Sequence, residues 1–135
     1  MGQLTFYFDR CFGKRFPQAL ALAKPPFSVE YHHSKSNNFR QEMDDDAWLD
    51  IVGAKGGGVV LSHDRRFHDQ SPCVAAMKQH KIGCFYLWGS QAETWEKLRC
   101  FVRRYDGVQN LVSSTKRPFI FHVGLHGKIQ KVPIP

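Results

Sequence analysis

Two apolar runs, FYFD at residues 6–9 and VVLSHD at residues 59–64, each end on an aspartate. A carboxylate that directly follows a buried strand is costly unless it faces water, a cation or a hydrogen-bond donor. Because Asp9 and Asp64 share this pattern, we expect them to share an environment. The segments around them indicate what that environment is.

Strand-like and helix-like segments alternate along the first two-thirds of the chain. Apolar runs predict strands at 4–8, 27–33, 58–64 and 81–88. Helical spacing predicts helices at 14–23, 44–54, 71–80 and 90–105. This order predicts an α/β protein of three layers, α/β/α, with a mainly parallel sheet. The segments 118–123 and 128–134, joined through GLHG, predict a C-terminal β-hairpin.

The last predicted helix has a recognisable start and an apolar stripe. Ser90 and Glu93 have the spacing of a capping box, which predicts that the helix begins at Ser90. One apolar face is predicted from Ala92, Trp95, Leu98, Val102 and Tyr105.

Length and composition indicate a globular protein. The 135 residues fit one domain, residues 1–135, and 42% of them are hydrophobic and 23% charged. No apolar run approaches the roughly 20 residues that cross a bilayer. The first residues lack the pattern of a secretory signal, so we expect a cytoplasmic protein without a membrane partner.

The chain is basic, with a net charge of +7 and a pI near 9.4. Part of the excess is clustered, at Lys97, Arg99, Arg103, Arg104, Lys116 and Arg117. Such a balance favours a polyanionic partner, most simply nucleic acid. An ordinary solvated basic surface is the alternative.

Other chemistries have weaker support. The four cysteines form no CxxC pair, which predicts free thiols rather than a zinc ribbon, and His122 and His126 bracket a predicted turn. GAKGGG lacks the spacing of a nucleotide-binding loop. A receiver-like phosphotransfer domain would need a lysine at the end of a later strand, and FYLWG at 85–89 has none. We expect the His63 side chain to point away from Asp64.

The carboxyl ends of parallel strands are where ligands bind in open α/β sheets. Asp9 and Asp64 follow the first and third predicted strands, so both are expected at this edge. A third group of acids, Asp44–Asp46, opens the second helix; it also fits an ordinary N-terminal cap. Close carboxylates repel one another unless a cation such as Mg²⁺ neutralises them. The pattern favours a metal-dependent site that acts on phosphodiesters.

Several segments together resemble PIN-like domains, particularly the toxin-type ribonucleases related to VapC. FYFDRCFGKRFPQAL resembles the opening strand, aspartate and helix of that group. DDDAWL resembles its acidic segment before tryptophan, and VVLSHDRRF its third strand with a terminal aspartate. PCVAAMKQHKIGCFYL also fits, and the resemblance extends over residues 4–105.

The resemblance implies a PIN-like fold that gathers acids around Mg²⁺ or Mn²⁺ to hydrolyse RNA, often as the toxin of a toxin–antitoxin pair. Asp9 and Asp64 match the first and third acidic positions, and either Asp45 or Asp46 matches the second. The expected partners are RNA, an antitoxin protein and a second copy of the chain. Basic residues beside these acids are candidate phosphate contacts: Arg10, Lys14, Arg65 and Arg66.

One departure from the family pattern concerns the helix after the third strand. Many relatives have an acid one turn into this helix, where SPCVA has Cys73 and Val74. Asp69 is the nearest substitute as a metal ligand. The alternative is therefore a catalytically weak or inactive PIN-like module that binds RNA or a protein.

Overall fold

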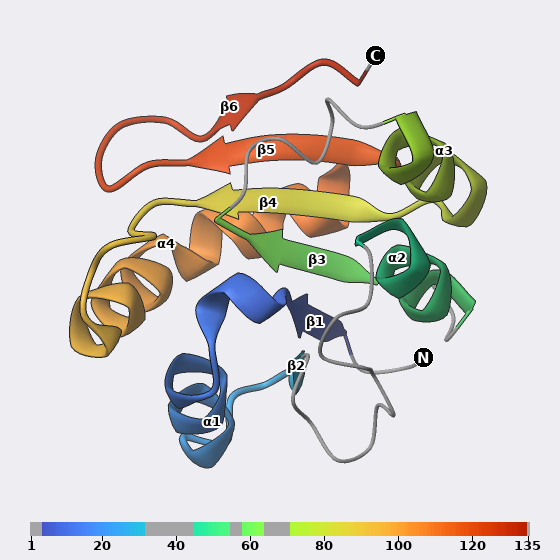
Figure 1. Cartoon of the computed structure of the whole chain (residues 1–135). Helices are drawn as coiled ribbons and strands as arrows, with labels where there is room; N and C mark the ends of the chain where they lie inside the picture. Colours follow the sequence, from blue (N-terminus) through green and yellow to red (C-terminus); the bar gives the residue numbers. More distant parts are fainter. Residues whose placement is uncertain (1–3, 32–44, 55–57, 64–70, 135) are drawn as a thin grey trace.

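The computed structural model describes residues 4–31, 45–54, 58–63 and 71–134, and its centre is a six-stranded sheet (Figure 1). The strands lie in the order β2-β1-β3-β4-β5-β6. The first five are parallel, and β6 pairs with β5 in the antiparallel direction. Their bounds are β1 Thr5–Phe8, β2 Ser28–Tyr31, β3 Val59–Ser62, β4 Gly83–Leu87, β5 Phe119–Val123 and β6 Gln130–Lys131.

Helices cover both faces of the sheet (Figure 1). Phe16 and Leu20 of α1 (Arg15–Leu22) and Phe101 and Val108 of α4 (Thr94–Ser114) belong to one buried cluster. The other cluster contains residues of α2 (Asp45–Ala54) and α3 (Ser71–His80), which pack against each other. A short 3-10 helix, η1 (Arg10–Phe12), joins β1 to α1. The predicted three-layer α/β/α fold with its C-terminal hairpin is confirmed.

Alternation along β1 explains how one strand serves both cores. Phe6 and Phe8 face the α1/α4 layer, whereas Tyr7 faces α2 and α3. Phe101 of α4 lies 6.0 Å, between ring centroids, from both Phe6 and Phe8. A cluster of aromatic rings therefore fixes α4 against the N-terminal strand.

The start and the buried face of α4 differ from the sequence prediction. The helix begins at Thr94, with Glu93 as its N-cap residue and without a side-chain cap hydrogen bond. The prediction that the helix begins at Ser90 with a capping box is therefore wrong. The buried residues are Cys100, Phe101 and Val108. Trp95 and Val102, which the sequence predicts on the apolar face with Leu98 and Tyr105, are 66% and 64% exposed. The helix has a second apolar stripe, and the sheet contacts the one centred on Phe101.

No helix in the described ranges is both long enough and apolar enough to cross a membrane.

Candidate functional site

The strand order reverses at β1, between the carboxyl ends of β1 and β3. From β1 the chain passes to β2 on one side, and it returns through α2 to β3 on the other side. In open α/β sheets ligands bind at such a reversal. Asp9 directly follows β1, and Ser62 is the last residue of β3. These two residues define the candidate site.

Asp9 is buried and held in place by the neighbouring strand. Its side chain and backbone together are only 5% exposed. Its backbone N–H donates to the carbonyl oxygen of Leu61 at 2.9 Å. The hydroxyl of Ser62 donates a hydrogen bond to Oδ2 of Asp9 at 3.1 Å. A donor of this kind offsets part of the cost of burying a carboxylate, and it also fixes the direction in which that carboxylate points.

The thiol of Cys11 lies beside this pair. Its sulfur is 3.7 Å from Oγ of Ser62, and it accepts a hydrogen bond from the backbone N–H of His63 at 3.3 Å. Burial of the sulfur, followed by the negative charge of Asp9, raises the pKa of the Cys11 thiol to about 12, although the residue keeps exposed surface. The thiol is therefore protonated at neutral pH, which does not suit a nucleophile.

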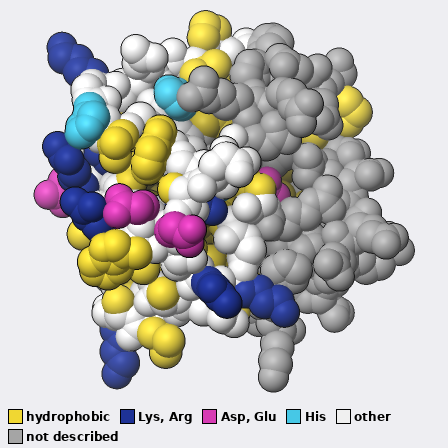
Figure 2. Space-filling model, turned by 60° about the vertical axis from the view of Figure 1, so that its left-hand side comes forward, with side chains coloured by type: hydrophobic (Ala, Val, Ile, Leu, Met, Phe, Trp, Pro, Cys, Tyr) yellow, Lys and Arg dark blue, Asp and Glu magenta, His cyan; other side chains and the backbone are white. Residues whose placement is uncertain are grey.

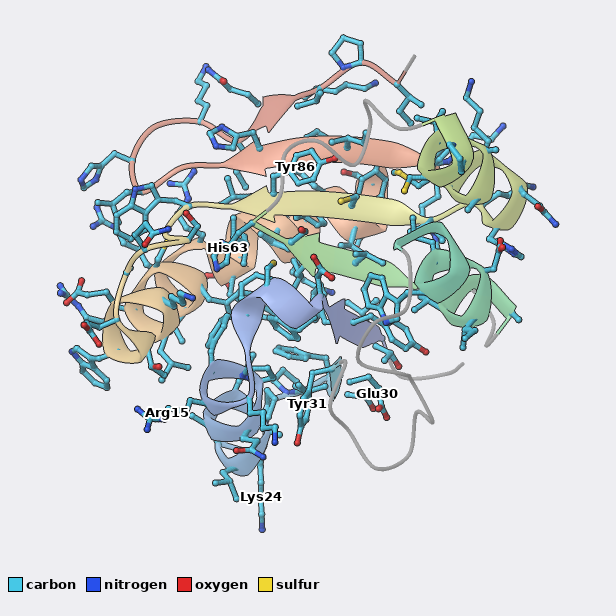
Figure 3. All side chains as sticks on the ribbon, in the orientation of Figure 1. Arg15, Lys24, Glu30, Tyr31, His63 and Tyr86 are labelled. Carbon is cyan, nitrogen blue, oxygen red and sulfur yellow. The ribbon has the colours of Figure 1, made fainter. Side chains whose placement is uncertain are left out.

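His63 follows Ser62 at the carboxyl end of β3 (Figure 3). Its Nδ1 lies 2.9 Å from the carbonyl oxygen of Leu87, and because a carbonyl only accepts, Nδ1 carries the proton. The ring centroid is 4.0 Å from that of Phe12. Burial, with a smaller effect of the Lys97 charge, lowers the pKa of His63. Neighbours from β4 and η1 thus fix the ring of a neutral histidine.

A hollow of about 460 Å³ adjoins His63 at the carboxyl end of β4. Its remaining lining comes from the segment that leads to α4: Leu87, Trp88, Gly89, Ser90, Gln91 and Ala92. Gly89 has φ +103, a conformation that favours glycine and allows the chain to turn here. His63 is the residue that links this hollow to the site, since neither Asp9 nor Ser62 lines it.

The structure describes only some of the predicted site residues. Asp9 is buried at the end of β1, and Lys14 is exposed immediately before α1. For Arg10, Asp45 and Asp46 it describes the backbone, in η1 and at the start of α2, but not the side chains. The other predicted residues fall outside the described ranges: Asp64, Arg65, Arg66 and Asp69. Convergence of the carboxylates stays a prediction.

Sequence reasoning missed Ser62 and Cys11 as members of the site. Ser62 had a detectable signal, because it lies two residues before Asp64, and alternate residues of a strand share a face. No pattern in the sequence could have identified Cys11, because its contact with Ser62 joins residues that lie 51 positions apart.

The chemistry at Asp9 fits a hard divalent cation. Carboxylate and hydroxyl oxygens are ligands that Mg²⁺ and Mn²⁺ prefer. Within the described ranges, however, no group of three or more histidine, cysteine, aspartate or glutamate side chains could hold a metal ion. Asp9 fits as one ligand, and a complete site needs acids from beyond those ranges.

Comparison with known proteins gives the family. A family described as PIN-like domain matches residues 4–89, the segment from β1 to just past β4 that includes Asp9 and Ser62. No match was found among curated proteins or among solved structures. The relation to the VapC group stays a prediction. The match covers more than half of the chain, and the protein therefore belongs to the PIN-like domain family.

Proposed function

We propose that the protein is a metal-dependent endoribonuclease that hydrolyses RNA phosphodiesters. PIN-like domains are generally nucleases, and the chain belongs to this family. The observation that carries the proposal is the buried Asp9 carboxylate, oriented by Ser62 where the strand order reverses. The net charge of +7 suits a polyanionic substrate.

The proposed metal ligands are Asp9, Asp64 and either Asp45 or Asp46, with Asp69 as a further candidate. Mg²⁺ or Mn²⁺ held there would activate water and neutralise charge that develops on the phosphate oxygens. Ser62 keeps Asp9 in its ligating direction. Basic side chains near these acids would hold the RNA phosphates: Arg10, Lys14, Arg65 and Arg66.

The proposed setting is the cytoplasm, with the protein as the toxin of a toxin–antitoxin pair. RNA is then the substrate, and an antitoxin protein the inhibitor. A second copy of the chain is a further proposed partner. The support for this setting is the resemblance of residues 4–105 to the VapC-related group.

A second candidate function is a PIN-like module that binds RNA or a protein without cleaving it. One observation favours it: the first turn of α3, where many relatives have an acid, holds Cys73 and Val74. Cys73 is fully buried against Met77 and the α2 residues of the same core. This turn of α3 thus contributes a core contact in place of a metal ligand.

Cleavage of a mixed RNA pool distinguishes the two functions. Purified protein is incubated with Mg²⁺, Mn²⁺ or EDTA, beside Asp9→Asn and Asp64→Asn variants whose folding is checked by circular dichroism. The nuclease predicts metal-dependent cutting that both variants lose. If the wild type binds RNA in a salt-sensitive manner and never cuts it, the binding module is correct.

A further inference from the structure

The exposed apolar stripe of α4 forms one wall of a groove that the catalytic proposal does not use. The groove has a volume of about 500 Å³. Its apolar lining comes from Trp95, Leu98 and Val102 of α4 and from Leu125 in the segment between β5 and β6. We call it the α4 groove. Figure 2 shows the corresponding face, where hydrophobic side chains lie among charged ones.

The second wall is held in place before any ligand arrives. Arg104 of α4 donates a hydrogen bond to the carbonyl oxygen of Gly127. A Cβ atom on Gly107 would lie only 3.1 Å from Cδ1 of Ile129, so the segment from Leu125 to Ile129 packs closely on the helix. A preformed groove binds its ligand at a lower entropic cost than a loop that must first become ordered.

The apolar residues of α4 that line the groove share one exposed face of the helix. Trp95 and Val102 lie seven residues apart, two turns of helix, and so share a face. Both are largely exposed. An apolar helical stripe that the protein's own core leaves uncovered is typical of a binding surface. The groove also lies beyond residues 4–89, the segment that matches the family.

The charges around the α4 groove are mostly positive and favour a negatively charged ligand. Arg99 and Arg103 line it, and Arg103 also lines an adjoining hollow with Arg104 and Lys128. Among the residues that line the α4 groove and the adjoining hollow, Glu96 is the one with a carboxylate, and it pairs with Arg99 at 3.2 Å. Both partners of that pair are exposed, so water screens it and a competing carboxylate can replace Glu96.

We propose that the α4 groove binds an acidic amphipathic segment of a protein partner. Apolar side chains of that segment would contact Trp95 and Val102, and its carboxylates would contact Arg99 and Arg103. A second copy of the chain would instead bring like charges together across a two-fold axis. RNA would bury phosphates against Leu98, Val102 and Leu125, which offer them no donor.

The test uses the full-length protein and two synthetic amphipathic helical peptides with identical apolar faces. One peptide has glutamate on its polar face and the other has lysine. Binding is followed by the tryptophan emission of the protein, and a Trp95→Phe variant assigns the signal to Trp95. The acidic peptide is expected to bind with a blue shift, and the basic peptide is not.

Charge reversal gives the decisive comparison. The double variant Arg99→Glu/Arg103→Glu is expected to exchange the preference, so that it binds the basic peptide. Arg15→Glu/Lys116→Glu makes the same change in net charge at exposed sites outside the groove, and it should retain the preference for the acidic peptide. Val102→Asp should weaken binding about tenfold or more, since it places a charge on the apolar lining.

Several outcomes would overturn the proposal. Equal binding of both peptides, or of neither, contradicts the role of charge. If both double variants lose the same amount of affinity for the acidic peptide, the net charge of the protein and not the groove determines binding. Dimerisation that Val102→Asp abolishes would identify a second copy as the occupant, and RNA binding lost only in Arg99→Glu/Arg103→Glu would identify RNA.

Discussion

The hydroxyl of Ser62, at the end of β3, donates a hydrogen bond to the carboxylate of Asp9, at the end of β1, across 3.1 Å. Both residues are buried. The bond joins two parallel strands at the place where the strand order reverses, and it restricts the directions in which Asp9 can point.

Replacing Ser62 tests this bond. Ser62→Ala removes the donor and leaves a buried carboxylate oxygen with one partner fewer, which is expected to cost about 1–3 kcal/mol of the free energy of unfolding. Urea denaturation of Ser62→Ala, Asp9→Asn and the double variant forms a double-mutant cycle. A coupling energy of zero would show that the two side chains do not stabilise each other.

Metal binding at Asp9 predicts a change in thermal stability. A cation that binds only the folded protein stabilises it, by about 2.7 kcal/mol when its concentration is 100 times its dissociation constant. Mg²⁺ or Mn²⁺ should therefore raise the melting temperature of the wild type, and EDTA should reverse the rise. Asp9→Asn should lose the effect, whereas Asp106→Asn, at an exposed carboxylate of α4, should keep it. An equal rise in both variants would place the metal elsewhere.

Two adjacent residues of α4 should respond differently to truncation. Phe101 is 2% exposed, so Phe101→Ala is expected to destabilise the protein by about 3–5 kcal/mol. Val102 is 64% exposed, and Val102→Ala should change stability by no more than about 0.5 kcal/mol. Chemical denaturation measures both. Similar losses for the two variants would mean that the buried face of α4 is assigned wrongly.

Alkaline pH should destabilise the protein partly through Tyr105. Burial, followed by the charge of Asp106, raises the pKa of Tyr105 above its usual 10.0. Above pH 10 the unfolded chain loses this proton while the folded protein keeps it, so stability falls as pH rises through the folded pKa.

The variant that isolates this effect is Tyr105→Phe, which keeps the stacking on Phe27. Between about pH 8 and about pH 11, its urea midpoint should fall less than that of the wild type. Parallel declines in the two proteins would contradict the shift.

Local patterns in the sequence were enough to predict the layers of this fold. The apolar runs that contain Phe6 and Val59 identified parallel strands, and the helical spacing between them required crossovers. The hydrogen bond from Ser62 to Asp9 was beyond such reasoning, because it bridges 53 residues. The buried face of α4 was misassigned for a related reason. Its two apolar stripes overlap at Leu98, and only packing against the sheet decides which one is buried.

The resemblance to PIN-like domains predicted both the domain family and the importance of Asp9, and it rested on short motifs at the ends of strands. The remaining acids that it named, Asp45, Asp46, Asp64 and Asp69, stay predictions. Motifs at strand ends indicate which residues lie at the same edge of the sheet. They do not give the distances between the carboxylates, because those distances depend on how the connecting segments fold.

The two apolar stripes of α4 have different roles. One packs in the core and stabilises the fold, and the other is exposed on the surface of the protein. Phe101 and Val108 are constrained by the aromatic core, but Trp95 and Val102 touch little of it. Substitutions on the outer stripe can therefore accumulate without loss of stability. Related chains with the same Asp9–Ser62 pair could diverge in which proteins they recognise while their shared architecture stays intact.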